Sequence, residues 1–175
     1  MPHEGHKRRE HAGRDDLAGE HKVSDIGQII LFILFIAANV IDIFWLNYSD
    51  WLRITVSYSI RIPVAAVILI PSGLMARSGL KTVFHDKRDQ LEVISTGVFG
   101  LVRHPIYLSS LMLYLGILIL TLSMPALIIF LFAVVFYYFI SRYEEQILIE
   151  KLGDRYREYM KAVPMFIPRL FKRRK

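Results

Sequence analysis

The chain has 175 residues, of which 54% are hydrophobic, with a formal net charge of +6 and a pI near 9.6. It contains no cysteine, which excludes disulfides, thiolate catalysis and cysteine-ligated metals. The hydrophobic residues fall mainly in four apolar blocks and both ends are strongly charged, as is typical of an integral membrane protein. Basic loops beside anionic lipid explain the positive charge better than nucleic acid does, so we expect membrane lipid and no nucleic acid as partners.

Residues 1–23 are polar and are predicted to be a disordered or loosely surface-bound tail, which leaves residues 24–175 as the membrane-embedded domain. The tail is not expected to be a cleavable signal, because it mixes both charge signs and the apolar run behind it is too long. Its histidines match no metal-ligand spacing, so we predict no metal site. These histidines are His3, His6, His11 and His21.

The first apolar segment is predicted at about Asp25–Leu46, with Ser24-Asp25 as its N-cap. Near its far end, Asp42 is interpreted as an interfacial carboxylate. The second segment is predicted at about Ile54–Ala76. Arg61 interrupts it, and two interpretations stay open: a functional charge, or a side chain that snorkels to the interface.

Residues 77–104 are predicted to form a polar connection, long for a loop between membrane helices. Two further apolar segments, about Pro105–Leu122 and Pro125–Ser141, are joined by so few residues that a tight helical hairpin is expected. The tail, residues 142–175, is predicted to continue as a helix to Tyr159 and to end in a membrane-surface anchor. The anchor consists of Phe166, Ile167, Leu170 and Phe171 beside Lys172, Arg173, Arg174 and Lys175.

Lysine and arginine are concentrated in both tails and in residues 77–104, whereas the connection after the first segment has only Arg53. The positive-inside rule therefore predicts a multi-pass protein with both termini cytoplasmic. We expect an all-α membrane bundle of about four transmembrane helices, followed by a C-terminal cytoplasmic helix. This topology places the open ends of the hairpin together on the cytoplasmic face.

Six polar side chains gather at those open ends. Carboxylates accept hydroxyl or ammonium groups, aromatic faces attract a sulfonium or ammonium, and arginine fixes a carboxylate or phosphate at two points. Spacing alone leaves a structural interpretation open, in which the arginines follow the positive-inside rule and the glutamates begin a solvated helix. The six residues are Arg103, His104, Tyr107, Arg142, Glu144 and Glu145.

Two sequence blocks carry a family resemblance. The first is Leu91-Glu92-Val93-Ile94-Ser95-Thr96-Gly97-Val98-Phe99, followed by Arg103-His104-Pro105-Ile106-Tyr107. The second is Glu144-Glu145, followed by Leu148, Gly153, Tyr156, Tyr159 and Val163-Pro164. Over roughly residues 77–170 the chain resembles the isoprenylcysteine carboxyl methyltransferase family, which with related phospholipid N-methyltransferases comprises small helical membrane enzymes that use S-adenosylmethionine. The Arg-His-Pro-x-Tyr piece alone also resembles NADPH-using sterol reductases.

The resemblance implies a role for each residue of the site. His104, Pro105 and Tyr107 would line the cofactor pocket, and Val93 and Ile94 would supply loop contacts. Glu144 would hold a polar group of the cofactor, and Glu145 would support it or face solvent. Arg103 and Arg142 would orient an acceptor carboxylate or phosphate, and Arg103 and His104 are the candidate catalytic residues.

Two residues depart from the family pattern. Phe99 stands where tyrosine is usual, so a hydroxyl contact is lost. Ser109 stands where glycine is common, so its side chain leaves less room for another group to approach the backbone closely. The Arg-His-Pro-x-Tyr and Glu-Glu pieces are intact.

The expected activity is S-adenosylmethionine-dependent methyl transfer to an amphiphilic acceptor such as an isoprenylcysteine carboxylate, with a lipid amine or small thiol as alternatives. An amine or thiol would need deprotonation, for which His104 is the candidate base. A second hypothesis is an NADPH-dependent enzyme of the sterol-reductase type, although the chain is short and has no glycine-rich dinucleotide loop. A third is a non-enzymatic membrane adaptor, which would tolerate loss of Glu144 and His104.

Overall fold

The structure, a computed structural model, describes residues 22–85 and 93–168. It is 84% helical and the described residues form no strand, which confirms the all-α prediction. The tail predicted over residues 1–23 lies almost wholly outside the described residues. In chain order the elements are α1 (Lys22–Ile41) with a π-helical extension (Asp42–Leu46), α2 (Asp50–Thr55), α3 (Tyr58–His85), a 3₁₀ turn (Gly97–Gly100), α4 (Pro105–Thr121), α5 (Met124–Leu152) and α6 (Asp154–Ala162).

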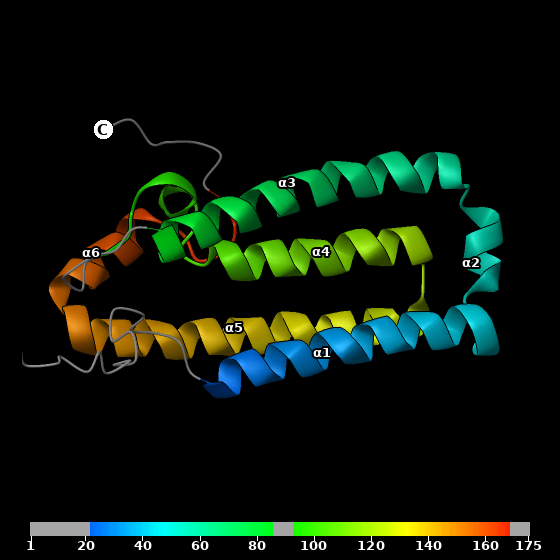
Figure 1. Ribbon diagram of the computed structural model, residues 1–175, viewed down its shortest axis with the longest axis horizontal. Coiled ribbons are helices and arrows are strands. Elements are labelled where there is room, and N and C mark those ends of the chain that lie inside the picture. The colour runs from blue at the N-terminus through cyan, green and yellow to red at the C-terminus, as the bar shows by residue number, and fades with distance from the viewer. Residues whose placement is uncertain (1–21, 86–92, 169–175) are drawn as a thin grey trace, which may run out of the picture.

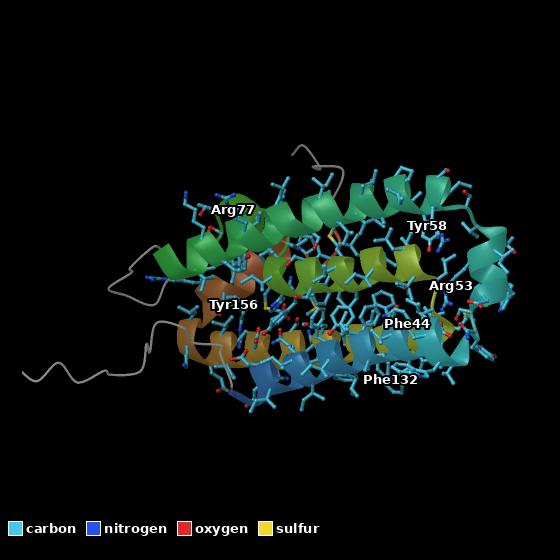
Figure 2. The ribbon with its side chains drawn as sticks, turned by 45° about the vertical axis from the view of Figure 1, so that its right-hand side comes forward. Phe44, Arg53, Tyr58, Arg77, Phe132 and Tyr156 are labelled. Atoms are coloured by element: carbon cyan, nitrogen blue, oxygen red, sulfur yellow. The ribbon has the colours of Figure 1, made fainter. Side chains whose placement is uncertain are left out.

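Within the part of the chain that the structure describes, three helical segments are long and apolar enough to cross a membrane. They are Asp25–Leu46, Tyr58–Val83 and Met124–Leu152. α4 is equally apolar but has 17 residues, about 26 Å of helix against a hydrocarbon core of about 30 Å. Large apolar side chains such as Phe44 and Phe132 (63% exposed) point outward from the bundle (Figure 2). Such an apolar exterior suits lipid rather than water.

Helix boundaries differ from the prediction at several places. α3 starts at Tyr58 after the short α2 and continues to His85, so the prediction of a polar loop from residue 77 is wrong over its first part. α5 continues unbroken through Glu144 and Glu145, as predicted, but it ends at Leu152, and α6 begins at Asp154. Lysine, arginine and glutamate are good helix formers, so a change from apolar to charged residues does not by itself end a helix. At the other end of the chain, α1 begins at Lys22, before the predicted cap at Ser24.

The bundle is built from two helix pairs, α3 with α4 and α1 with α5 (Figure 1). Small residues allow the first pair to approach closely, since a Cβ on Gly116 would lie 2.4 Å from Cδ2 of Leu69. Ser72 on α3 also donates a hydrogen bond to the carbonyl of Ser109 on α4 at 2.8 Å. In the second pair, a Cβ on Gly27 of α1 would lie 2.6 Å from Cζ of Phe136 on α5.

A buried charge network closes the end of the bundle around α2. Asp42 is fully buried and lies 2.5 Å from Nη2 of Arg53, so this carboxylate is paired inside the end of the bundle, and its place at the membrane interface stays a prediction. Arg61, 2% exposed, donates to the carbonyl of Leu120 at 2.8 Å and lies 3.8 Å from the centre of the Tyr58 ring. Arg61 is therefore buried within the bundle, where it satisfies a carbonyl that the C-terminus of α4 leaves without a partner.

The opposite end of the bundle assembles the residues singled out by the sequence. The start of α4, the end of α5 and all of α6 lie together there, at the left of Figure 1, and Figure 2 places Tyr156 at this end and Arg53 and Tyr58 at the other. The chain order therefore brings residues 103–107 and 142–145 to one place, as the predicted hairpin requires.

Candidate active site

The start of α4 fixes the first part of the site. α4 begins at Pro105, and His104 precedes its first turn with φ −120° and ψ 65°. Proline begins a helix without losing a hydrogen bond, because the first N–H of a helix has no internal partner. A Cβ on Gly79 of α3 would lie 2.9 Å from Cγ1 of Ile106, so the start of α4 is held tightly against α3. His104 and Tyr107 thus extend from a fixed helix end.

α5 supplies two consecutive carboxylates in different environments. Glu145 is 1% exposed, whereas Glu144 is half-buried. Burial of Glu145 rules out the expectation that it faces solvent. A carboxylate stays charged at such a position only when it is paired and hydrogen-bonded.

His104 lies between the two carboxylates. Nε of Arg103 donates to Oε1 of Glu145 at 2.7 Å, and Nε2 of His104 lies 3.3 Å from the same oxygen. On the other side, Nδ1 of His104 is 3.6 Å from Oε2 of Glu144. The hydroxyl of Tyr107 donates to Oε1 of Glu144. The predicted residues 103, 104, 107, 144 and 145 therefore form one connected polar cluster.

Aromatic rings surround the imidazole. The His104 and Tyr107 rings are stacked, with centroids 5.7 Å apart and 3° between their planes. The Tyr107 ring in turn contacts Tyr137 of α5 at 5.3 Å. Phe166 lies 6.0 Å from His104 and so packs against the cluster, whereas Ile167 is 83% exposed, and the membrane anchor stays a prediction. The anchor residues from position 170 onward lie outside the described residues.

Arg142 and Pro105 lie at the edges of this cluster. The Arg142 side chain is 52% exposed, and its Nη1 is 3.8 Å from Oε2 of Glu145. Pro105 is buried, and it contacts the α3 side near Gly79.

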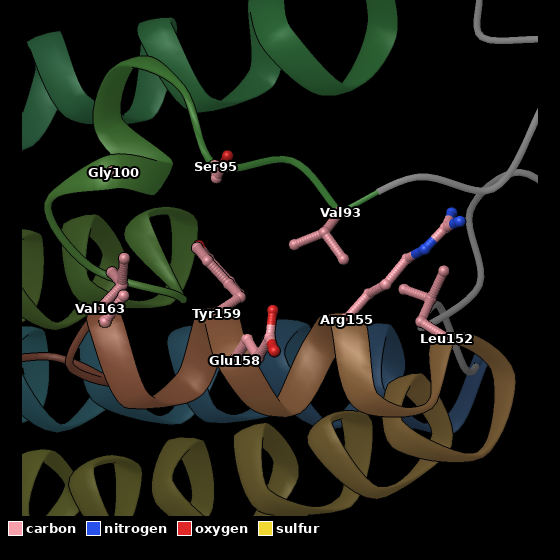
Figure 3. A pocket seen from close by; sticks show the side chains of 9 residues that line it. Val93, Ser95, Gly100, Leu152, Arg155, Glu158, Tyr159 and Val163 are labelled. Atoms are coloured by element: carbon pink, nitrogen blue, oxygen red, sulfur yellow. The ribbon is translucent and has the colours of Figure 1, made fainter.

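A separate pocket of about 640 Å³ lies beside the cluster, between residues 93–100 and α6 (Figure 3). Val93 lines it, as do the polar side chains of Ser95, Arg155 and Glu158. Ile94 is half-buried in the same loop but does not line the pocket. The volume of the pocket lies in the range that small-molecule sites have.

Two tyrosines of α6 form a supporting layer to which sequence reasoning gave no role. Tyr156, Tyr159 and Val163 are buried together, and the Tyr159 hydroxyl donates to the carbonyl of Phe99 at 2.6 Å. Burial raises the pKa of Tyr159 to about 12 although Arg103 opposes the shift, and burial likewise raises the pKa of Tyr156. Both hydroxyls therefore stay protonated at neutral pH. Tyr156 and Tyr159 are three residues apart and so lie on one face of a helix, and this spacing was the sequence feature that could have indicated a shared role.

The two departures from the family pattern lie away from the carboxylates. Phe99 takes part through its carbonyl, which accepts the hydrogen bond from Tyr159. Ser109 is buried at the α3–α4 contact, where its hydroxyl donates to the carbonyl of Ile106 at 2.7 Å.

With this geometry established, the comparisons with known proteins define the class. The sequence model of the phospholipid methyltransferase family matches residues 66–155, about half of the chain, from the middle of α3 into α6. The chain belongs to this family, which is shared with the isoprenylcysteine carboxyl methyltransferases. Its members are membrane methyltransferases that act on lipid substrates and generally use S-adenosylmethionine. Neither the curated proteins nor the solved structures contained a match.

Proposed function

We propose that this protein is an S-adenosylmethionine-dependent methyltransferase whose acceptor is an amphiphile such as an isoprenylcysteine carboxylate, with a lipid amine or small thiol as alternatives. The observation that carries the proposal is the buried pairing of Glu144 and Glu145 with His104 and Tyr107 at the polar end of a membrane bundle. The family assignment supports the reaction class.

The cluster fits the proposed cofactor chemically. Oε2 of Glu145 is buried and accepts no hydrogen bond from the described residues. A buried acceptor of this kind suits an ammonium group or a ribose hydroxyl. The stacked rings of His104 and Tyr107 offer the aromatic surface that a sulfonium favours. These residues, with Glu144, are the proposed holders of the cofactor.

The loop and helix start complete the proposed cofactor site. Val93 contributes the wall of the neighbouring pocket, and Ile94 lies in the same loop. Pro105 keeps the helix start in place. The pocket adds room for the parts of the cofactor that extend beyond the carboxylates.

S-adenosylmethionine supplies an electrophilic methyl group bound to a sulfonium. The residues of this chain contribute mainly proximity and alignment. A carboxylate acceptor needs no general base. For an amine or thiol acceptor, His104 takes the proton, at a ring nitrogen that lies beside a carboxylate. Arg142, exposed at the edge of the cluster, is the proposed guide for an acceptor carboxylate or phosphate.

The proposed site faces the cytoplasm, as the distribution of lysine and arginine predicts. In that orientation the cofactor enters from the cytosol, while an amphiphilic acceptor enters sideways from the bilayer. Both reactants then meet at the boundary where the polar cluster adjoins the apolar helices.

Calorimetric titration with S-adenosylhomocysteine tests the proposal in detergent-purified protein. We expect saturable binding by the parent and at least about tenfold weaker binding by Glu144→Gln and by His104→Ala, because hydrogen bonds to charged groups are lost. Glu150→Gln, on the exposed surface of the same helix, is the matched control and should bind like the parent. Absence of binding by folded parent protein would contradict the proposal, and NADPH would be titrated next.

A further inference from the structure

The chain after Gly153 forms a strap across the cluster. This C-terminal strap consists of α6 and residues 163–166. The backbone N–H of Arg103 donates to the carbonyl of Pro164 at 2.9 Å, and that of His104 donates to the carbonyl of Met165 at 3.3 Å. The two residues immediately before α4 thus use the strap as their hydrogen-bond partner. The strap in turn positions Phe166 against His104.

One guanidinium joins the strap to the carboxylate helix. Nη1 of Arg103 donates to the carbonyls of Met160 and Val163 at 3.0 and 2.6 Å, while its Nε holds Glu145. The Arg103 side chain is itself buried, with 9% exposed. Met160 is in the last turn of α6, where carbonyls lack helical partners and a cation is favourable. Arg103 therefore caps α6 and holds α5 at the same time.

The strap has a hinge and a second fastening. Gly153 has φ +61° and ψ −133° and separates α5 from α6, and a Cβ there would meet no atom within 4 Å. Gly153 therefore adopts a backbone conformation that residues with a side chain disfavour, and no neighbouring atom would contact a side chain there. Farther along, the Tyr159 hydroxyl is fastened to the carbonyl of Phe99.

The strap encloses the groups that the proposed function needs. His104 is 7% exposed and Glu145 almost fully buried, so a ligand reaches them only if a covering element moves. The strap is attached to the bundle by the hydrogen bonds of Arg103, His104 and Tyr159 and by one small apolar cluster around Tyr156. Breaking the hydrogen bonds exposes backbone groups that water can satisfy, so the remaining cost of opening the strap is the exposure of that cluster.

We infer that Arg103 is a positioning residue that latches the C-terminal strap over the cofactor site, and that opening of this latch admits and releases the cofactor. The inference rests on the proposed function for the identity of the ligand. In this inference the Arg103 guanidinium binds Glu145 and the strap, and it does not bind the carboxylate of an acceptor.

Amide hydrogen exchange tests the latch without any cofactor. The amide of His104 is shielded in the parent by its bond to the strap. We expect its exchange to be about threefold to tenfold faster in Tyr159→Phe and in Arg103→Lys, the range for loss of one hydrogen bond. Tyr138→Phe, on the exposed side of α5, is the matched control and should exchange like the parent. Unchanged exchange in both latch variants would overturn the inference.

Binding kinetics of S-adenosylhomocysteine then test the gating role. Because the latch restrains entry and exit alike, Tyr159→Phe should raise the association and dissociation rates by a similar factor and leave Kd nearly constant. If Arg103→Lys instead raises the KM for the acceptor with unchanged cofactor rates, Arg103 is an acceptor ligand and the inference is wrong. A parent that binds no S-adenosylhomocysteine would contradict the proposed function, while the exchange of the His104 amide would still decide the latch.

Discussion

Arg53 holds two aspartates whose surroundings differ sharply. Its Nη2 is 2.5 Å from the fully buried Asp42, and its Nη1 is 2.5 Å from Asp50, whose side chain is 49% exposed. The same guanidinium therefore makes one buried and one solvent-exposed ion pair. Exposed pairs contribute little because water screens them and holding them costs side-chain entropy, whereas breaking a buried pair leaves an uncompensated charge.

This contrast predicts different costs for the same substitution. Asp42→Asn should lower the free energy of unfolding by about 3–5 kcal/mol, since Arg53 loses its buried partner. Asp50→Asn, the matched control, should cost less than about 1 kcal/mol. Thermal unfolding of the two variants in one detergent measures the difference. Equal stabilities would show that burial does not decide the strength of this network.

At the scale of helices, the α3–α4 contact depends on the absence of side chains. Gly116 of α4 faces Leu69 of α3 at a distance that no Cβ can share without displacement of the leucine. Close approach of this kind is how membrane helices gain packing energy, because lipid supplies no hydrophobic driving force between them. The close contact between α3 and α4 also fixes the position of His104, because His104 immediately precedes α4.

Gly116→Val should therefore lower the free energy of unfolding by about 1–3 kcal/mol through overpacking. Gly73→Ala is the matched control on α3, because a Cβ at Gly73 meets nothing within 4 Å. That substitution should stabilise the helix by about 0.5–1 kcal/mol. Unfolding midpoints of both variants in the same detergent provide the measurement. Stabilisation by both variants would indicate that helix propensity, and not packing, governs this pair.

For the molecule as a whole, the two ends of the bundle are chemically distinct. One end carries the buried Asp42–Arg53–Arg61 network, and the other carries the carboxylate cluster and the strap. Among the described residues, Arg77 and Lys81 near the end of α3 and the basic residues of α6 lie at the strap end, whereas the other end carries Arg53 and Arg61. The positive-inside rule then predicts that this end is cytoplasmic.

Because the chain has no cysteine, single cysteines report this orientation without background. Tyr48 lies exposed before α2, and Glu150 lies exposed near the end of α5. In intact cells a membrane-impermeant maleimide should label Tyr48→Cys, and it should label Glu150→Cys only after permeabilisation. The parent protein controls for non-specific labelling. The reverse pattern would place the cluster on the outer face and contradict the proposed entry of the cofactor.

The sequence by itself determined the all-α membrane fold, the hairpin that brings residues 103–107 to residues 142–145, and the residue types of the cluster. These follow from local properties: apolar length, a short turn, and the order of polar residues along the chain. It did not determine that α3 continues past Arg77 to His85, because charged residues form helices readily and their appearance does not mark a helix end.

Only the tertiary structure decided which charges are buried and what each holds. Asp42 and Arg61 appeared interfacial or ambiguous in sequence, yet packing buries both. Arg103 appeared to be a substrate ligand, yet it contacts carbonyls 57 and 60 residues away in the chain. Backbone carbonyls carry no signature in sequence, and a charge finds its partner only when folding brings distant helix ends together.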